Sequence, residues 1–239
     1  MALQPWRKGR IIQIEDHTHN TRRYWIEVPD TDRFDFIPGQ FVTMDLPISE
    51  KANKRLRSYS IASWPDGTNV FELLIVLTPS GIGTHYLFNE SSIGSEIIFR
   101  GAQGVFQLPE TLDKDLLLVC TGTGVAPFRS MVQHILLHQL PHRDIHLVFG
   151  CRHRSDLLYY DEFKELEIQL PGFHYYPTLS RENWEGSHGY VHPIYERIAS
   201  GKPELLFYLC GWKNMIDEAK KRVMDMGYDK KAIHLELYG

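Results

Sequence analysis

Short apolar runs separated by turn residues dominate the first half of the chain. They predict strands at residues 9–15, 22–28, 41–46, 57–63, 70–78 and 96–100, with a short helix at 83–89. Short strands at regular spacing, bounded by Gly and Pro turns, favour a barrel or a sandwich. We therefore expect a β domain of about six strands over residues 1–110.

The pattern changes in the second half. Residues 116–120 form a continuous apolar run, as expected of a strand buried in a parallel sheet. Helical spacing follows at 127–140, where Pro127 suits the first turn. Strands at 145–149, 173–179, 205–210 and 232–237 then alternate with helices at 160–168, 191–199 and from about 213. This alternation predicts an α/β domain over residues 111–239, with a parallel sheet and right-handed crossovers.

Composition is that of an ordinary globular protein. The 239 residues suffice for two domains, with 43% hydrophobic and 23% charged residues. A net charge of −4 gives no general affinity for nucleic acid. The longest apolar run is too short to span a bilayer, and residues 1–10 lack the apolar core of a signal peptide. We therefore expect a cytoplasmic protein that binds neither nucleic acid nor membranes.

The cysteines and histidines do not form a metal-binding pattern. Cys120, Cys151 and Cys210 are widely spaced and include no Cys-x-x-Cys, so neither an iron–sulfur cluster nor a structural zinc site is expected. Histidine pairs at 17/19 and 138/142 have spacings that could bind a metal. With twelve histidines such pairs arise by chance, and we expect no metal site.

The turn Thr121-Gly122-Thr123-Gly124 lies at the carboxyl end of the first parallel strand, where ligands bind in open α/β sheets. Its glycines allow close approach to a phosphate or a flat ring, and the following helix start favours an anion. Pro127 stands where the dinucleotide fingerprint has its third glycine. Taken alone, the turn could therefore be structural or could bind a nucleotide.

Two later strand ends carry companion residues. Ser180 and Arg181 follow a predicted strand, and a cation beside a hydroxyl suits a 2′-phosphate, whereas an acidic residue would suit a free ribose. Cys210-Gly211 follows another strand beside the same crevice. The alternatives are a solvated loop charge for Arg181 and plain packing for Cys210.

In the first half, Arg57, Tyr59 and Ser60 share one predicted strand, with Arg57 and Tyr59 on the same face. Tyr59 could lie against a flavin ring, while Arg57 meets its diphosphate and Ser60 reaches a ring nitrogen. Residues 80–84 supply a helix start with free amides, a second anion site. The alternative is a tyrosine-bearing barrel strand followed by an ordinary turn.

Taken together, these motifs resemble the ferredoxin–NADP(+) reductase family over nearly the whole chain. Seven elements occur in the family's order and spacing: Arg57-Ser58-Tyr59-Ser60, residues 81–84, residues 121–127, Phe149-Gly150-Cys151-Arg152, Ser180-Arg181, Cys210-Gly211 with Met215, and Glu236-Leu237-Tyr238. The resemblance implies an antiparallel six-stranded barrel that binds FAD over 1–110, and a parallel-sheet domain that binds NADP(H) over 111–239.

By the same resemblance, individual residues acquire roles. Arg57, Tyr59 and Ser60 would contact the diphosphate, ring and N5 edge of the flavin, and Gly83 and Thr84 would bind its phosphates. The nicotinamide side would use Thr121, Gly122, Gly124 and Cys210. The 2′-phosphate would meet Ser180 and Arg181, with His188 at the position of the family's lysine and Tyr190 at that of its adenine-stacking tyrosine. Glu236 matches the carboxylate of the flavin's proton traffic, and Tyr238 matches the ring that covers the flavin.

Four positions depart from the family pattern. Val76 stands where a basic residue is frequent, and Ala102 where proline is usual. His188 replaces the lysine, which would make the phosphate contact weaker and pH-sensitive. Gly239 follows Tyr238, whereas plant-type members end at the tyrosine.

The resemblance implies a flavoenzyme that exchanges a hydride between NADPH and FAD and passes single electrons to or from a ferredoxin or flavodoxin. Ser60, Cys210 and Glu236 are the candidates for orienting the rings and handling the proton. The alternatives are an oxygenase reductase component, a free-flavin reductase, or a non-catalytic electron-transfer subunit. Basic residues Lys51, Lys54 and Arg55 precede the flavin strand, either as a docking site for an acidic carrier or as a solvated loop.

Overall fold

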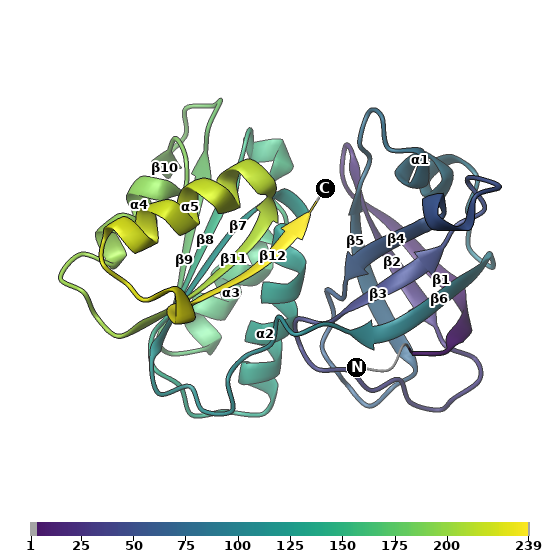
Figure 1. Cartoon of the computed structure of the whole chain (residues 1–239), viewed down its shortest axis with the longest axis horizontal. Coiled ribbons are helices and arrows are strands. Elements are labelled where there is room, and N and C mark those ends of the chain that lie inside the picture. Colours follow the sequence, from purple (N-terminus) through teal and green to yellow (C-terminus); the bar gives the residue numbers. More distant parts are fainter. Residues whose placement is uncertain (1–3, 239) are drawn as a thin grey trace. The chain divides into compact units, whose positions relative to one another are not determined.

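The computed structural model describes residues 4–238 and separates into two compact units (Figure 1). One unit runs to Gln107 and also includes Arg129–His134, and the other comprises Leu108–Phe128 and the chain from Ile135 onward. Gly239 lies outside the described residues, so its effect on the terminal tyrosine stays undescribed.

The first unit is a closed antiparallel sheet. Its strands are β1 (Trp6–Thr18), β2 (Thr21–Glu27), β3 (Phe41–Asp45), β4 (Leu56–Ser60), β5 (Val70–Val76) and β6 (Glu96–Gln103), in the order β4-β3-β6-β1-β2-β5. The pairings between these neighbours are antiparallel. An antiparallel bridge between Ile61 and Leu73 joins the chain after β4 to β5, the two ends of that order. The predicted six-stranded barrel is therefore confirmed.

Apolar side chains at alternate strand positions point into the barrel and form its core. Phe34 packs its ring 5.0 Å from that of Phe71 and 5.8 Å from that of Phe99, measured between centroids. Helix α1 (Ile82–Asn89) contributes Leu87, which is buried, and its carbonyl accepts the hydroxyl of Tyr24 at 2.9 Å. These contacts attach α1 to the barrel and set the position of its first turn.

The second unit is a parallel sheet. Its strands are β7 (Asp115–Thr121), β8 (Ile145–Cys151), β9 (Phe173–Leu179), β10 (Ser187–His188), β11 (Leu205–Trp212) and β12 (Ile233–Tyr238), in the order β10-β9-β8-β7-β11-β12. The pairings between these neighbours are parallel, as predicted. The two-residue strand β10 was not expected, because so short a segment has no periodicity.

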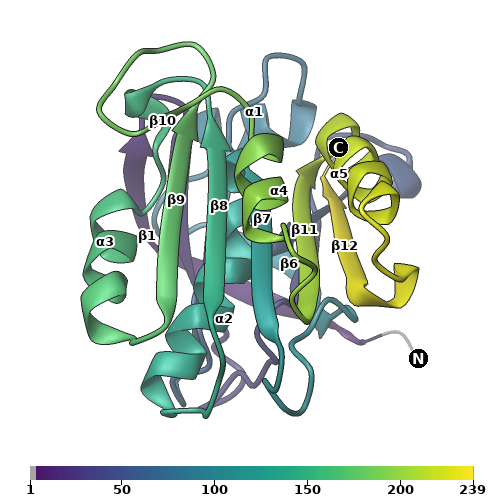
Figure 2. The ribbon, with the colours of Figure 1, turned by 90° about the vertical axis from the view of Figure 1, so that its left-hand side faces the viewer.

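Helices cover both faces of this sheet. The helices are α2 (Ala126–Leu137), α3 (Tyr160–Gln169), α4 (His192–Ile198) and α5 (Lys213–Asp225). Tyr176 packs with the core formed by α4 and α5, whereas the ring of its neighbour Tyr175 lies 5.2 Å from Phe163 of α3. Successive strand residues face opposite sides, so α3 lies on the face opposite to α4 and α5 (Figure 2). No helix in residues 4–238 is long and apolar enough to cross a membrane.

Candidate functional site

In the first unit, the side chain of Arg57 crosses the first turn of α1. A Cβ atom added at Gly83 would lie 3.0 Å from Arg57 Cγ and 3.1 Å from its Nε, so the arginine lies directly against this glycine. Arg57 Nη1 also donates to the carbonyl oxygens of Lys54 at 3.0 Å and Leu56 at 2.7 Å. The guanidinium is thus held beside a helix start before any ligand arrives.

The first turn of α1 is prepared for an anion. Gly81 is the residue before the helix, and the hydroxyl of Thr84 donates back to its carbonyl at 2.9 Å. The same hydroxyl accepts the amide of Thr78 at 3.2 Å, so it stabilises the turn itself. The opening amides of a helix have no intrahelical acceptor. Together with Arg57 they suit a diphosphate, which makes the backbone of Thr84 its expected contact with the anion.

Tyr59 and Ser60 follow Arg57 on β4. Burial raises the pKa of Tyr59, only partly opposed by the nearby Arg57 cation, so its phenol is neutral at physiological pH. The ring of Tyr59 packs at the margin of the barrel core, and Ser60 is buried. Strand β4 therefore presents a guanidinium and an aromatic ring on one segment, as the sequence predicts.

In the second unit, glycines bring the ends of β7 and β11 into contact. A Cβ at Gly124 would lie 2.5 Å from the carbonyl oxygen of Cys210, and one at Gly211 would lie 2.6 Å from the hydroxyl of Thr121. Gly211 also has a φ of +141°. Side chains are sterically excluded at both positions, which lets the turn η2 (Gly122–Val125) pack on the end of β11.

Thr121 leaves a buried polar atom at this junction. Its hydroxyl is buried and has no hydrogen-bond partner among residues 4–238. Next to it, a Cβ at Gly122 would meet nothing within 4 Å. A buried hydroxyl without a partner beside open space fits a ligand that carries a polar group, such as the carboxamide of nicotinamide.

Cys210, Glu236 and Tyr238 meet at the same end of the sheet. Cys210 pairs in register with Glu236 of β12, and its thiol donates to Glu236 Oε2 across 3.9 Å. Burial, followed by the Glu236 carboxylate and Cys120, raises the pKa of the Cys210 thiol well above its usual range, and a hydrogen bond with Tyr238 opposes this. The thiol is therefore neutral, and it can orient a carboxylate but is a poor nucleophile.

The predicted 2′-phosphate residues follow β9. The amide of Ser180 donates to Cys151 O and that of Arg181 to Arg152 O, both at 3.0 Å, so these residues continue alongside the end of β8. Arg181 and His188 are exposed, and the ring of Tyr190 is 74% exposed. Arg181, His188 and Tyr190 therefore lie on open surface, whereas Ser180 is half-buried and its hydroxyl donates to the carbonyl of Cys151 at 3.2 Å.

Two further arginines lie at this end of the sheet, and the sequence analysis assigned a role to neither of them. Arg152 and Arg154 follow β8, and the amide of Arg154 donates to Glu182 Oε2 at 2.8 Å while its guanidinium pairs with Glu185 at 3.3 Å. Their position after a neighbouring parallel strand was the signal available, because carboxyl ends of parallel strands share one edge. Glu182 and Glu185 partly neutralise the added charge.

Comparison with known proteins identifies the two units. The model of the oxidoreductase FAD-binding domain matches residues 8–108, and that of the oxidoreductase NAD-binding domain matches residues 118–221. Over 240 residues the chain is 31% identical to ferredoxin–NADP reductase B of Sorangium cellulosum, covering 97% of each protein. The chain belongs to the ferredoxin–NADP(+) reductase family.

Other similarities extend to reductases of oxygenase systems. The chain is 29% identical to the electron transfer component of anthranilate 1,2-dioxygenase from Acinetobacter baylyi, covering 79% of the chain but only 54% of that protein.

Among solved structures, a ferredoxin–NADP(+) reductase from Neisseria gonorrhoeae with bound FAD and NADP has a TM-score of 0.80 at 25% identity, covering 97% of the chain and 98% of that structure. The predicted family is thus confirmed.

Family membership establishes the class of chemistry. The chain is an FAD-dependent oxidoreductase that uses a nicotinamide dinucleotide and passes electrons to an acceptor, as the sequence predicts. The residues present fit both cofactors: the Arg57–Gly83 contact suits the flavin diphosphate, and the Thr121 hydroxyl suits the nicotinamide. The roles of individual residues remain proposals.

Proposed function

We propose that the chain exchanges a hydride between NADPH and FAD and passes single electrons to or from a ferredoxin or flavodoxin. The observation that carries the proposal is the cluster at the ends of β7, β11 and β12. There Thr121 offers a hydroxyl that has no partner among residues 4–238, Cys210 a neutral thiol and Glu236 a carboxylate. Such a set can orient a carboxamide-bearing ring and exchange a proton.

Residues 1–110 act as the FAD domain in this proposal. Arg57 and the opening amides of α1, including those of Gly83 and Thr84, bind the diphosphate. Tyr59 lies against the flavin ring as a neutral phenol, and the Ser60 hydroxyl serves the N5 edge. When bound, FAD supplies the conversion between two-electron and one-electron transfer.

Residues 111–239 act as the NADP(H) domain. Gly122 and Gly124 keep side chains away from the nicotinamide, and Thr121 supplies a hydroxyl for its carboxamide. The neutral Cys210 thiol orients Glu236 by donating toward its carboxylate, and Glu236 holds or releases the proton. Tyr238 covers the flavin's nicotinamide face and contacts the Cys210 thiol.

A preference for NADPH over NADH rests on the edge after β9. Ser180 and Arg181 provide a hydroxyl and an exposed cation for the 2′-phosphate, with His188 as a weaker third contact. The exposed ring of Tyr190 stacks on the adenine. Arg152 and Arg154 add positive charge at the same edge.

The proposed carrier is an acidic ferredoxin or flavodoxin. Lys51 and Lys54 are exposed at the turn η1 (Ala52–Lys54), which leads into β4. Arg55 contributes less, because its Nε lies 2.6 Å from Asp45 Oδ1. We further propose a cytoplasmic location, where its three free cysteines would stay reduced.

A second candidate is the reductase component of an oxygenase, supported by the 29% identity to the anthranilate dioxygenase component. Stopped-flow reduction of the purified protein by NADPH and by NADH separates the two. Faster reduction by NADPH, followed by electron transfer to an isolated ferredoxin or flavodoxin, supports the first function. Equal or faster reduction by NADH, with no transfer to either carrier, supports the second.

A further inference from the structure

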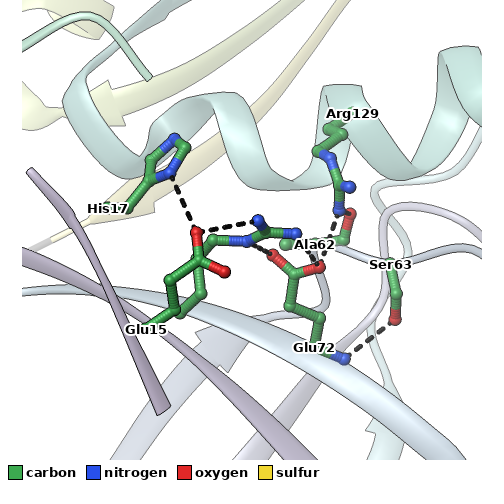
Figure 3. Close-up of polar contacts among 7 residues, drawn as sticks. Glu15, His17, Ala62, Ser63, Glu72 and Arg129 are labelled. Atoms are coloured by element: carbon green, nitrogen blue, oxygen red, sulfur yellow. Dashed lines mark hydrogen bonds and ion pairs between the residues drawn. The ribbon is translucent and has the colours of Figure 1, made fainter. Parts of the chain in front are cut away.

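A buried carboxylate lies on β5 of the barrel. Glu72 is 2% exposed. Its two oxygens accept Arg23 Nε at 2.7 Å and Arg23 Nη2 at 3.1 Å, and Oε2 also accepts Arg129 Nη1 at 3.0 Å (Figure 3). Arg129 is itself 4% exposed and belongs to the stretch of α2 that clusters with the barrel. One buried carboxylate therefore joins two guanidinium groups.

The same cluster holds the chain that follows β4. Arg129 Nη1 donates to the carbonyl of Ala62 at 3.0 Å, and its guanidinium lies 5.2 Å from the ring centroid of Trp64. The backbone of Glu72 binds this segment as well: its carbonyl accepts the amide of Ala62 at 2.8 Å, and its amide donates to the Ser63 hydroxyl at 2.9 Å. Both main-chain groups of Ala62 are thus bonded, two residues after Ser60.

The stability of the barrel does not require these buried charges. A well-packed apolar set in place of a buried ion pair is often neutral or stabilising, because the desolvation of charges is costly. A buried ion pair instead fixes the geometry of the groups it joins, because a guanidinium that shifted would leave an unpaired charge and a carbonyl without its hydrogen bond. The bonds from Arg129 reach one carboxylate and one carbonyl at the same time, which fixes Ala62 relative to β5.

The neighbours of the cluster keep its charge constant. Glu15 Oε1 accepts Arg23 Nη1 at 3.2 Å, and His17 Nδ1 lies 3.9 Å from the same oxygen. Burial, followed by the Arg23 cation, lowers the pKa of His17, so this histidine is neutral at physiological pH. The arrangement is therefore suited to a fixed position rather than to a pH switch.

We propose that Glu72 and Arg129 are positioning residues for the flavin. Through Ala62 they hold the segment that continues from Tyr59 and Ser60, so that these two side chains keep their place against the ring. The inference rests on the proposed flavin contacts of Tyr59 and Ser60. Misplacement of reacting groups by about 1 Å can slow a reaction by roughly a hundredfold. A small shift of this segment should therefore slow reduction of the flavin.

The test uses the full chain carrying FAD. The double variant Glu72→Met/Arg129→Met removes the pair but keeps side-chain volume, and Arg33→Met is the matched control because it breaks an exposed pair with Asp35. Arg23 also loses Glu72 and keeps Glu15 as a partner, so we expect the double variant to fold with a lowered thermal midpoint. We also expect it to bind FAD about tenfold more weakly and to show a changed visible circular dichroism of the flavin. Flavin reduction at saturating NADPH slows by roughly ten- to a hundredfold with KM unchanged.

Arg129→Lys provides the second measurement. A lysine keeps the charge, but its ammonium on a flexible stem does not reproduce the planar guanidinium that contacts Glu72, Ala62 and the ring of Trp64. If the double variant fails to fold, a folded Arg129→Lys protein with slower flavin reduction and altered flavin dichroism supports the inference. Wild-type rate, FAD affinity and dichroism in either folded variant overturn it. Failure of the wild-type chain to bind FAD would instead defeat the proposed function.

Discussion

The Cys210 thiol lies 3.9 Å from Oε2 of Glu236, and the two residues are direct partners in the parallel pairing of β11 with β12. Strand register alone therefore places a neutral donor beside a carboxylate. No loop has to fold over to assemble the pair. The arrangement makes Glu236 the first position at which the proposed mechanism can be tested.

Glu236→Gln should slow flavin reduction by NADPH about tenfold or more, because the amide cannot exchange the proton. The FAD spectrum and the thermal midpoint should stay close to wild type, since glutamine has nearly the same shape. Single-turnover stopped-flow absorbance measures the rate. An unchanged rate, or simple loss of FAD, would show that Glu236 has a structural role.

Arg181→Ala should raise KM for NADPH roughly tenfold to a hundredfold and leave NADH nearly unchanged, because a charged hydrogen bond to phosphate contributes about 1.5–3 kcal/mol. Arg143→Ala is the control, since Arg143 pairs with Asp115 at the opposite end of the sheet, where the central strands β7 and β8 begin. Steady-state kinetics with both nucleotides decide the matter. Equal losses with NADPH and NADH would rule out the 2′-phosphate role.

Gly124→Ala should weaken NADPH binding and destabilise the protein by about 1–3 kcal/mol, because the new Cβ would meet the Cys210 backbone. Gly122→Asn is the comparison: Gly122 has a φ of +54° and open space around its Cβ position. Asparagine tolerates this conformation, so the fold should survive. Urea denaturation measures the difference, and equal stability of the two variants would contradict the close approach.

Stability should fall in mild acid, in part through His192. Burial lowers the pKa of His192 below 6.5, so the unfolded chain takes up its proton first as the pH drops. The free energy of unfolding therefore decreases as the pH falls from about 6.5 to the folded-state pKa. Denaturation curves from about pH 5.5 to 7.5 should show a shallower decrease in His192→Gln. A variant with the wild-type slope would exclude His192 as a contributor.

Lys51→Glu/Lys54→Glu should slow electron transfer to an acidic carrier and weaken its salt dependence. The charge-matched control is Lys230→Glu/Lys231→Glu, which alters two exposed lysines of the second unit. Flavin reduction by NADPH should be unaffected in both. Carrier reduction that is equally slow in the two double variants would indicate a general charge effect without a docking site at η1.

The sequence predicted the fold closely because both periodicities are strong. Apolar runs located the strands. The close contact between the ends of β7 and β11, where a Cβ added at Gly124 would lie 2.5 Å from the carbonyl oxygen of Cys210, was not predicted, because the glycine turn was interpreted only as room for a ligand. Strand ends were less accurate. Strand β4 stops at Ser60, although the apolar pattern continued to 63, because the backbone beyond it bonds with Glu72 instead.

The Glu72–Arg129 pair was not predicted, since it joins residues 57 positions apart. A signal was nevertheless present. Glu72 is the one charged residue within Val70–Val76, where it interrupts a run of otherwise apolar side chains. A lone carboxylate in such a strand requires a cation, but the sequence does not indicate which of the chain's 26 lysines and arginines supplies it.

The edge position of β12 has a consequence for the lifetime of the active form. Within the described sheet, β12 pairs on one side only, with β11. Edge strands open before central ones, so β12 can detach from β11 while the central strands stay paired. In the proposed mechanism such an opening would separate Glu236 from Cys210 and leave a yellow, folded protein with impaired turnover until the strand pairs again.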